Sequence, residues 1–264
     1  MTHVMGILNV TPDSFSDGGQ WHQADAAIQR GLALASTGAD FVDVGGESTR
    51  PGAERVDAEV ELARVLPVVR ALSAEGVAVS IDTMRAATAR AAVEAGAVLV
   101  NDVSGGLADP RMAGTIADLN CDYVAMHWRA HSTEMDRHDA YDDVVAQVRD
   151  ELAARVEALT RAGVDLGRIV LDPGLGFSKV AESNWPLLAR LEDWAGDARV
   201  LIGASRKRFL APDKAPLERE HATTAVTTMC AAHGVWAVRV HDSQAARDAI
   251  AVVSSWNNGR DRPE

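Results

Sequence analysis

Short runs of β-branched and other apolar residues alternate along the chain with alanine-rich stretches whose apolar positions recur at helical spacing. We expect eight strands, at Val4–Leu8, Phe41–Val44, Val77–Ile81, Val98–Val100, Tyr123–Met126, Ile169–Leu171, Val200–Ile202 and Val235–Val240. We expect helices among them, at Ala24–Ser36, Ala58–Ser73, Arg85–Glu94, Asp143–Arg161, Asn184–Trp194, Ala222–His233 and Ser243–Trp256. Glycines that suit a left-handed helix cap follow four helical runs, at Gly38, Gly76, Gly96 and Gly163.

Alternation of short apolar strands with helices predicts a parallel sheet that is covered on both faces. Eight such units in 264 residues average about 33 residues each. This spacing favours α/β architecture as a single (β/α)8 TIM barrel, with a doubly wound open sheet as the alternative. We expect one domain over residues 1–264, with a frayed polar tail at 257–264.

Polar residues stand where each strand ends, and in a parallel barrel these ends meet on one face. A single polar strand end is most often a helix N-cap, but a polar residue at every strand end indicates a small-molecule site. These residues are Asn9, Asp43, Asp82, Asn101, His127, Asp172, Ser205, Lys207, Arg239 and His241.

Two long polar loops follow the first and second strands, at residues 6–19 and 43–52. Neither has the glycine spacing of a Walker A or dinucleotide-binding motif. We expect both to be mobile and to close over the C-terminal face of the barrel when substrate binds.

Composition narrows the class of protein and of ligand. The net charge of −12 argues against general binding to nucleic acid or to an anionic membrane, since both would be repelled. No apolar run is long enough to cross a bilayer and no signal peptide is evident, so we expect a soluble cytoplasmic protein. Lysine occurs only at Lys179, Lys207 and Lys214, against 23 arginines, which singles out Lys207 between two arginines.

Seven segments together resemble the dihydropteroate synthases, in that family's order and over residues 6–242. They are residues 6–19, 43–52, 80–83, 101–106, 172–177, 205–207 and 239–242. The resemblance implies a barrel enzyme that joins 6-hydroxymethyl-7,8-dihydropterin pyrophosphate to p-aminobenzoate, with release of pyrophosphate. It also implies Mg²⁺ as cofactor and a homodimer, and it places the protein at the step of folate synthesis that sulfonamides block.

The resemblance assigns the pterin to Asp172, Asn101 and Asp82. A carboxylate suits the amidine edge of a pterin because it accepts two parallel hydrogen bonds. Asn101 offers a donor and an acceptor to the adjacent ring edge, and Asp82 contacts a further ring nitrogen. Met126 packs on the ring in this interpretation, with core packing nearly as good an explanation. Helix capping is the alternative for the two aspartates.

Two basic residues complete the predicted pterin site. Lys207 donates to the pterin carbonyl or a ring nitrogen, and Arg239 stacks on the ring while its guanidinium reaches the pyrophosphate. Surface salt bridges are the alternative for both. Neither residue is expected to support the core, so replacing either should hardly change the melting temperature.

The pyrophosphate is assigned to Arg239, Val240 and His241, just before a helix N-terminus where free N–H groups bind anions. The resemblance further implies that Asn9 carries the Mg²⁺ ion that bridges the leaving group. A lone asparagine is a weak metal motif by itself, since Mg²⁺ normally keeps waters and takes oxygens from substrate phosphate.

The p-aminobenzoate carboxylate is assigned to Ser205 and the turn after it. Phe15, Pro51 and Phe177 are expected to enclose the ring, with Thr49 and Arg50 supplied by the second loop. Asp17 and Arg50 are expected to settle on the charged platform formed by pyrophosphate and Mg²⁺. For Phe177 alone, core packing is the simpler explanation. The segment Trp128–His131 departs from the usual pattern, so the fifth loop is expected to differ in shape.

A dihydropterin can delocalise positive charge onto its exocyclic methylene carbon, so we favour an SN1-like path. Two other functions stay open: a non-catalytic pterin-binding paralogue, and a methyltetrahydrofolate-dependent corrinoid methyltransferase on the same type of barrel.

Overall fold

The structure, a computed structural model, describes residues 1–11, 20–47, 55–131 and 139–260. Eight parallel strands close into a barrel in chain order, with β8 paired to β1. The strands are β1 His3–Asn9, β2 Phe41–Gly45, β3 Val79–Asp82, β4 Leu99–Asp102, β5 Asp122–Met126, β6 Ile169–Asp172, β7 Arg199–Ile202 and β8 Ala237–Val240. The predicted TIM barrel is confirmed, and the open-sheet alternative is wrong.

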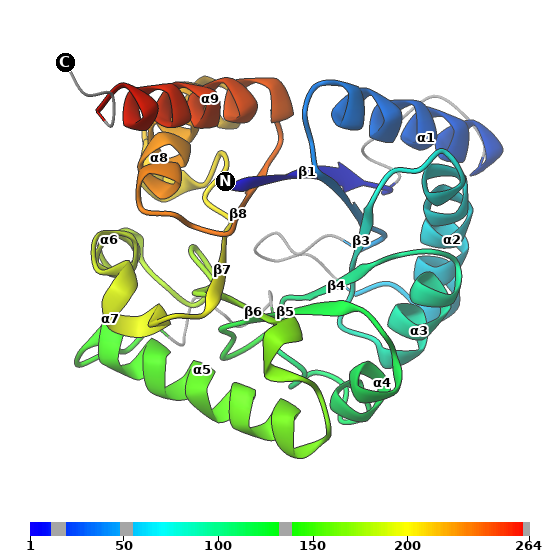
Figure 1. The fold of residues 1–264 in the computed structure, drawn as a ribbon. Helices are drawn as coiled ribbons and strands as arrows, with labels where there is room; N and C mark the ends of the chain where they lie inside the picture. The colour runs from blue at the N-terminus through cyan, green and yellow to red at the C-terminus, as the bar shows by residue number, and fades with distance from the viewer. Residues whose placement is uncertain (12–19, 48–54, 132–138, 261–264) are drawn as a thin grey trace.

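Helices form a ring around the strands (Figure 1). They are α1 Gln20–Ser36, α2 Ala58–Ala74, α3 Ala86–Glu94, α4 Met112–Asp118, α5 Val144–Arg161, α6 Ala181–Ala189, α7 Leu191–Ala195, α8 Glu220–Ala232 and α9 Ser243–Arg260. Short 3-10 helices lie at η3 Leu166–Arg168, η4 Arg208–Leu210 and η5 Pro216–Arg219. No helix in the described ranges is both long and apolar enough to cross a membrane.

Three helix boundaries differ from the sequence prediction. Helix α4 was missed because its seven residues are too few to show a helical period; Asp109 starts it by accepting from the Arg111 N–H at 3.0 Å. The single helix expected at Asn184–Trp194 is two helices, because the chain leaves helical geometry at Arg190 (φ −122°, ψ 47°). Helix α9 continues to Arg260, so residues 257–260 of the expected frayed tail are helical.

The four glycines expected to cap helices all adopt positive φ, between 77° and 113°. Only glycine enters this region without a steric cost, which is why the helical runs end there.

Two apolar layers hold the barrel together. The larger lies between the strands and the surrounding helices, where side chains such as Val42, Ile81 and Leu72 are fully buried. The smaller fills the barrel interior and contains Met5, Leu99, Val124, Val170, Leu201 and Ala237. Because side chains on a strand alternate between its faces, the residue two places further along points into the barrel again, nearer its C-terminal mouth.

Candidate active site

Side chains on a strand alternate between its two faces, so the residue two positions after each interior apolar residue also faces the barrel interior. On β4 and β6 these positions, directly above the interior apolar layer, are occupied by polar residues. Asn101 follows Leu99 on β4, and Asp172 follows Val170 on β6. Strand register then aligns the rim of the barrel: Asn9 pairs with Gly45, Gly45 with Asp82, and Asp82 with Asn101.

Met126 and Asp172 pair in the same way on β5 and β6. Met126 is 3% exposed and belongs to neither apolar cluster, so it lies at the mouth rather than in the core. The structure thus gathers the predicted pterin residues of five strands at one end of the barrel.

A buried ion cluster lies at the centre of this rim. Arg239 donates from Nε to Asp43 Oδ2 at 2.6 Å and from Nη2 to Asp82 Oδ2 at 2.8 Å. Asn101 Nδ2 donates to the same Asp43 oxygen at 2.9 Å. Asp43 is fully buried, and its other oxygen has no hydrogen-bond partner among the described residues. Asp43 therefore fixes the orientation of two predicted pterin residues.

Sequence reasoning named Asp43 as a polar strand end and gave it no role. Its position two residues after Phe41, at the rim of the interior, was the signal that it faces the site. The expectation that Arg239 does not support the core is wrong, because the buried Asp43 carboxylate depends on its charge.

The pKa values follow this burial. Burial raises the pKa of Asp82 to about 7, against the opposing charge of Arg239 and with help from Asp43. Burial opposes the charge of Arg239, but the carboxylates of Asp43 and Asp82 outweigh it and hold the pKa of Arg239 above its ordinary value. The pKa of Asp82 therefore lies near neutral pH, so this carboxyl can be protonated or ionised at the pH of the reaction.

Asp172 lies beside the turn that follows β6. Its Oδ1 accepts from the Gly174 N–H at 2.7 Å, and burial raises the pKa of the carboxyl while Lys207 lowers it. Burial in turn lowers the pKa of Lys207 to about 8. Lys207 Nζ donates to the Leu175 carbonyl and lies 4.6 Å from the centre of the Phe177 ring. The structure thus brings together Asp172 and Lys207, which were assigned to the pterin, and Phe177, which was assigned to p-aminobenzoate.

Ser205 and His241 touch each other. Ser205 Oγ lies 2.9 Å from His241 Nδ1 and accepts from the His241 backbone N–H at 3.2 Å. The residues assigned to the p-aminobenzoate carboxylate and to pyrophosphate are therefore neighbours at the ends of β7 and β8. The Val240 side chain is 2% exposed in the layer behind the barrel, so it does not face the mouth.

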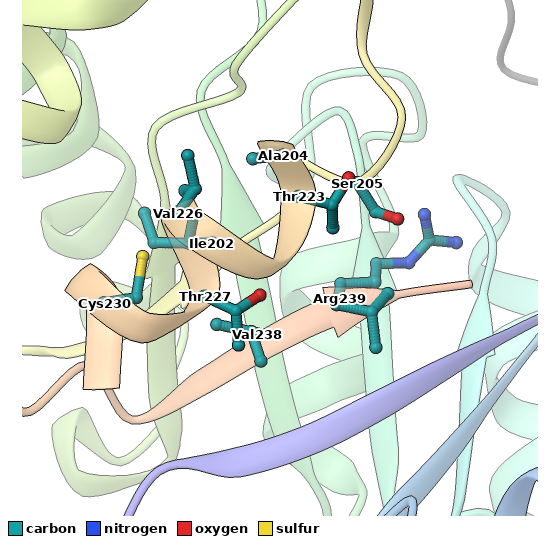
Figure 2. A pocket seen from close by; sticks show the side chains of 10 residues that line it. Ile202, Ala204, Ser205, Thr223, Val226, Thr227, Cys230, Val238 and Arg239 are labelled. Carbon is teal, nitrogen blue, oxygen red and sulfur yellow. The ribbon is translucent and has the colours of Figure 1, made fainter. Parts of the chain in front are cut away.

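A cavity of about 10 Å³ lies behind these residues, between β7, β8 and α8. Figure 2 shows the Arg239 guanidinium extending away from the cavity, while Cys230 lies at its other end. The volume is at the lower limit for one water molecule, and the lining is mostly apolar, so this cavity is a packing defect and not a substrate site.

Asn9 is half-buried at the end of β1, and its side-chain oxygen would lie 3.8 Å from a Cβ placed on Gly45. The absent side chain at Gly45 leaves room between Asn9 and Asp82. Among the described residues, no cluster of three or more His, Cys, Asp or Glu side chains could hold a metal. One amide oxygen suits Mg²⁺ only as an ion that takes most of its ligands from water and phosphate.

Five predicted site residues, Phe15, Asp17, Thr49, Arg50 and Pro51, lie outside the described residues. The chain on both sides of segment 48–54 is held by Arg85, which donates to Glu47 at 2.5 Å, to buried Glu61 at 2.7 Å and to the Val56 carbonyl. Arg55 adds a bond to Glu47 at 3.1 Å.

Comparison with known proteins agrees with this geometry. The family model for "Pterin binding enzyme" matches residues 5–241. A dihydropteroate synthase from Mycobacterium leprae is 51% identical over 263 residues, covering 96% of this chain and 93% of that one.

Two solved structures of Xanthomonas albilineans dihydropteroate synthase have the same fold. One, with 4-aminobenzoic acid, has a TM-score of 0.90 at 41% identity and covers 99% of this chain and 94% of that one. The other, in complex with 7,8-dihydropteroate, has a TM-score of 0.87 at 39% identity and covers 99% and 95%.

Proposed function

This chain belongs to the pterin-binding enzyme family, and from that premise we propose how its barrel mouth carries out the dihydropteroate synthase reaction. In that reaction 6-hydroxymethyl-7,8-dihydropterin pyrophosphate and p-aminobenzoate give 7,8-dihydropteroate and pyrophosphate. The observation that carries the proposal is the convergence of Asp82, Asn101, Asp172 and Arg239 on one rim of the barrel.

The pterin binds over the carboxylates. Asp172 accepts hydrogen bonds from the two N–H groups of the amidine edge. The Gly174 N–H donates to Asp172 Oδ1 and so holds the carboxylate in place for this contact. Asn101 meets the next ring edge, with its amide oriented by Asp43. Asp82 accepts from a further ring N–H, and Met126 packs on the ring. Lys207, close to Asp172, donates to the pterin carbonyl or ring nitrogen.

The pyrophosphate lies toward β8, at His241 and the helix N-terminus that begins at Ser243. Asn9 would hold a Mg²⁺ ion through its side-chain amide oxygen. When bound, that ion supplies positive charge that stabilises the leaving group.

The bond from the methylene carbon to the pyrophosphate oxygen breaks first, and its electron pair leaves with pyrophosphate. The carboxylates of Asp82 and Asp172 stabilise the positive charge that spreads over the pterin. The amine of p-aminobenzoate then forms the new C–N bond, and the resulting anilinium nitrogen gives its extra proton to water. An aniline is neutral at pH 7, so this path needs no strong base.

The second substrate binds beside the first. Ser205 binds the carboxylate of p-aminobenzoate, and Phe177, beside Lys207, covers its ring. Residues of the two long loops complete the pocket. Ser205 exchanges its bond to His241 for one to the substrate, so binding of the two substrates is coupled through that pair.

A coupled pyrophosphate-release assay tests the function directly. We expect release only when both substrates and Mg²⁺ are present, with no release when p-aminobenzoate is omitted. A protein that binds the pterin and releases nothing would be a non-catalytic binder. Methyl transfer from methyltetrahydrofolate to a corrinoid, without pyrophosphate release, would establish the methyltransferase alternative.

We also propose that the chain forms a homodimer. Met229 on α8 and Val252 and Trp256 on the neighbouring α9 are apolar side chains more than half exposed. Light scattering should give twice the 28.0 kDa chain mass, and Val252→Glu should halve it. A cytoplasmic location stays a prediction.

A further inference from the structure

Lys179 is a buried amine that the proposed function does not use. It is 8% exposed, and its Nζ lies 2.9 Å from His127 Nδ1. The same nitrogen donates to the carbonyls of Gly174 at 3.2 Å and Phe177 at 3.1 Å. An ammonium group has three N–H donors, so these three acceptors use all of them.

The backbone around Lys179 is strained in a way that serves this contact. Ser178 has φ 48°, a left-handed conformation that costs a non-glycine residue about 1–2 kcal/mol. Gly174, at φ 66°, lies so close to β5 that a Cβ there would be 2.3 Å from the His127 carbonyl oxygen. The turn is therefore pressed against β5, with the Lys179 amine beneath it.

His127 connects Lys179 to the helix layer. Because Lys179 donates to Nδ1, the ring proton is on Nε2, which donates to Glu151 on α5 at 2.9 Å. Burial and the charge of Lys179 lower the pKa of His127 to about 4, so the ring is neutral at pH 7. Arg129 also donates to Glu151, at 3.1 Å, and stacks 3.9 Å from the centre of the Tyr141 ring.

On the other side, the turn contains Phe177 and contacts two further residues of the proposed site, Asp172 and Lys207. Gly174 donates its N–H to Asp172, and Phe177 faces Lys207, which donates to the Leu175 carbonyl. Two of the three lysines in the chain therefore hold carbonyls of the same turn.

We propose that Lys179 is a positioning residue for the pterin: its ammonium group holds the Gly174–Phe177 turn, and thereby the Asp172 carboxylate and the Phe177 ring, in the geometry that binds substrate. The inference rests on the proposed function. Burial lowers the pKa of Lys179 to about 7, so keeping this amine charged in the folded protein costs free energy. An arginine could not replace it, because a guanidinium group is too large and planar to reach three acceptors in divergent directions.

Lys179→Met removes the ammonium and keeps the stem, and Lys214→Met makes the same change at an exposed position. Calorimetry with 6-hydroxymethylpterin should show an affinity loss of about tenfold for Lys179→Met. A loss of this size is typical when one hydrogen-bonding group in a binding site is out of position. Lys214→Met should match the wild type. The KM values for the pterin substrate and for p-aminobenzoate should both rise in Lys179→Met. Partial unfolding would instead lower kcat and leave both KM values unchanged.

Wild-type affinity in folded Lys179→Met would overturn the proposal. If that variant does not fold, the wild type answers the question, because lysine labelled with ¹⁵N at Nζ alone gives one side-chain NMR signal for each of the three lysines. Adding the pterin should shift the signals of Lys179 and Lys207 and leave that of Lys214 in place. An unmoved Lys179 signal would overturn the proposal.

These readouts separate the inference from the proposed function. A wild type that binds the pterin and releases no pyrophosphate would defeat the proposed function, while the effect of Lys179 on pterin binding would remain. Normal pyrophosphate release together with unchanged pterin affinity in Lys179→Met would defeat only the inference.

Discussion

Replacing Arg239 with methionine removes the charge at the centre of the site and keeps most of the side-chain stem. In the variant, the fully buried Asp43 has lost its cation, and Asp82 has lost the same partner. An unpaired buried carboxylate is strongly destabilising, at about 3–5 kcal/mol for a broken buried pair. The carboxyl limits this loss by binding a proton, which makes the loss depend on pH.

The limit can be worked out for each pH. Keeping a proton costs about 1.4 kcal/mol for each pH unit above the ordinary aspartate value of about 3.9. For one aspartate that must stay protonated when the protein is folded, the limit is therefore about 4 kcal/mol at pH 7 and about 1.5 kcal/mol at pH 5. Asp82 adds little to the loss in the free energy of unfolding. Burial already raises its pKa to about 7, so this carboxyl is largely protonated at pH 5. The loss of stability should thus grow as pH rises.

Urea unfolding at pH 5 and pH 7 measures this difference in the free energy of unfolding. Arg190→Met is the matched control: its ion pair with Asp193 is about half exposed, so we expect a change within about 0.5 kcal/mol. Adding Asp43→Asn to Arg239→Met should recover most of the loss at pH 7, because the fully buried charge of Asp43 is then absent. A loss below about 1 kcal/mol at pH 7, or an equal loss at both pH values, would refute the reasoning.

The remaining predictions concern ligands. Asp172→Asn turns one acceptor into a donor facing the pterin N–H groups, so calorimetry should show at least about tenfold weaker pterin binding in a folded protein; equal affinity would remove Asp172 from the site. Lys207→Ala should lower pyrophosphate release strongly with little change in melting temperature, because burial already lowers the pKa of this lysine to about 8 and its charge adds no stability; lost stability with normal turnover would contradict this. Pterin binding should release nearly one proton at about pH 6 and little at about pH 8, because the ligand replaces the proton that Asp82 holds below its pKa of about 7; calorimetry in buffers of different ionisation enthalpy measures it, and pH-independent release would count against Asp82. Labelled p-aminobenzoate should bind much more tightly with pterin, pyrophosphate and Mg²⁺ present, and Arg50→Ala should reduce that enhancement; equal binding with and without pyrophosphate would mean a preformed pocket.

The barrel and its polar rim could be predicted from the sequence because both follow from local patterns. Strand residues alternate between faces, and parallel strands end on one side, so Asp82, Asn101 and Asp172 had to meet there. The boundaries that failed, at α4 and at Arg190, are those where a segment is too short for a period to show.

Partners at long sequence separation could not be predicted. Arg239 and Asp43 are 196 positions apart, and several cations and acids occupy strand ends, so no pattern tells which cation reaches which acid. Lys179 was noted only as a rare lysine, because its acceptors are a histidine 52 positions away and two carbonyls of a turn. Such contacts depend on the closed barrel.

The charge arrangement at the mouth bears on the proposed order of bond breaking. Carboxylates come from β2, β3 and β6, while His241 and Lys207 follow β8 and β7. Arg239 is already shared between Asp43 and Asp82, so its charge mainly offsets theirs and less of it is left for pyrophosphate than the sequence led us to expect. The leaving group must then draw its compensation from the β7–β8 side, and Mg²⁺ would add positive charge there when bound. Positive charge that develops on the pterin stays over acids, while negative charge departs toward Lys207 and the N-terminus of α9. That separation of charge stabilises the pterin cation and the pyrophosphate anion of a dissociative path. It stabilises less the five-coordinate carbon of a direct displacement, and so favours the SN1-like path.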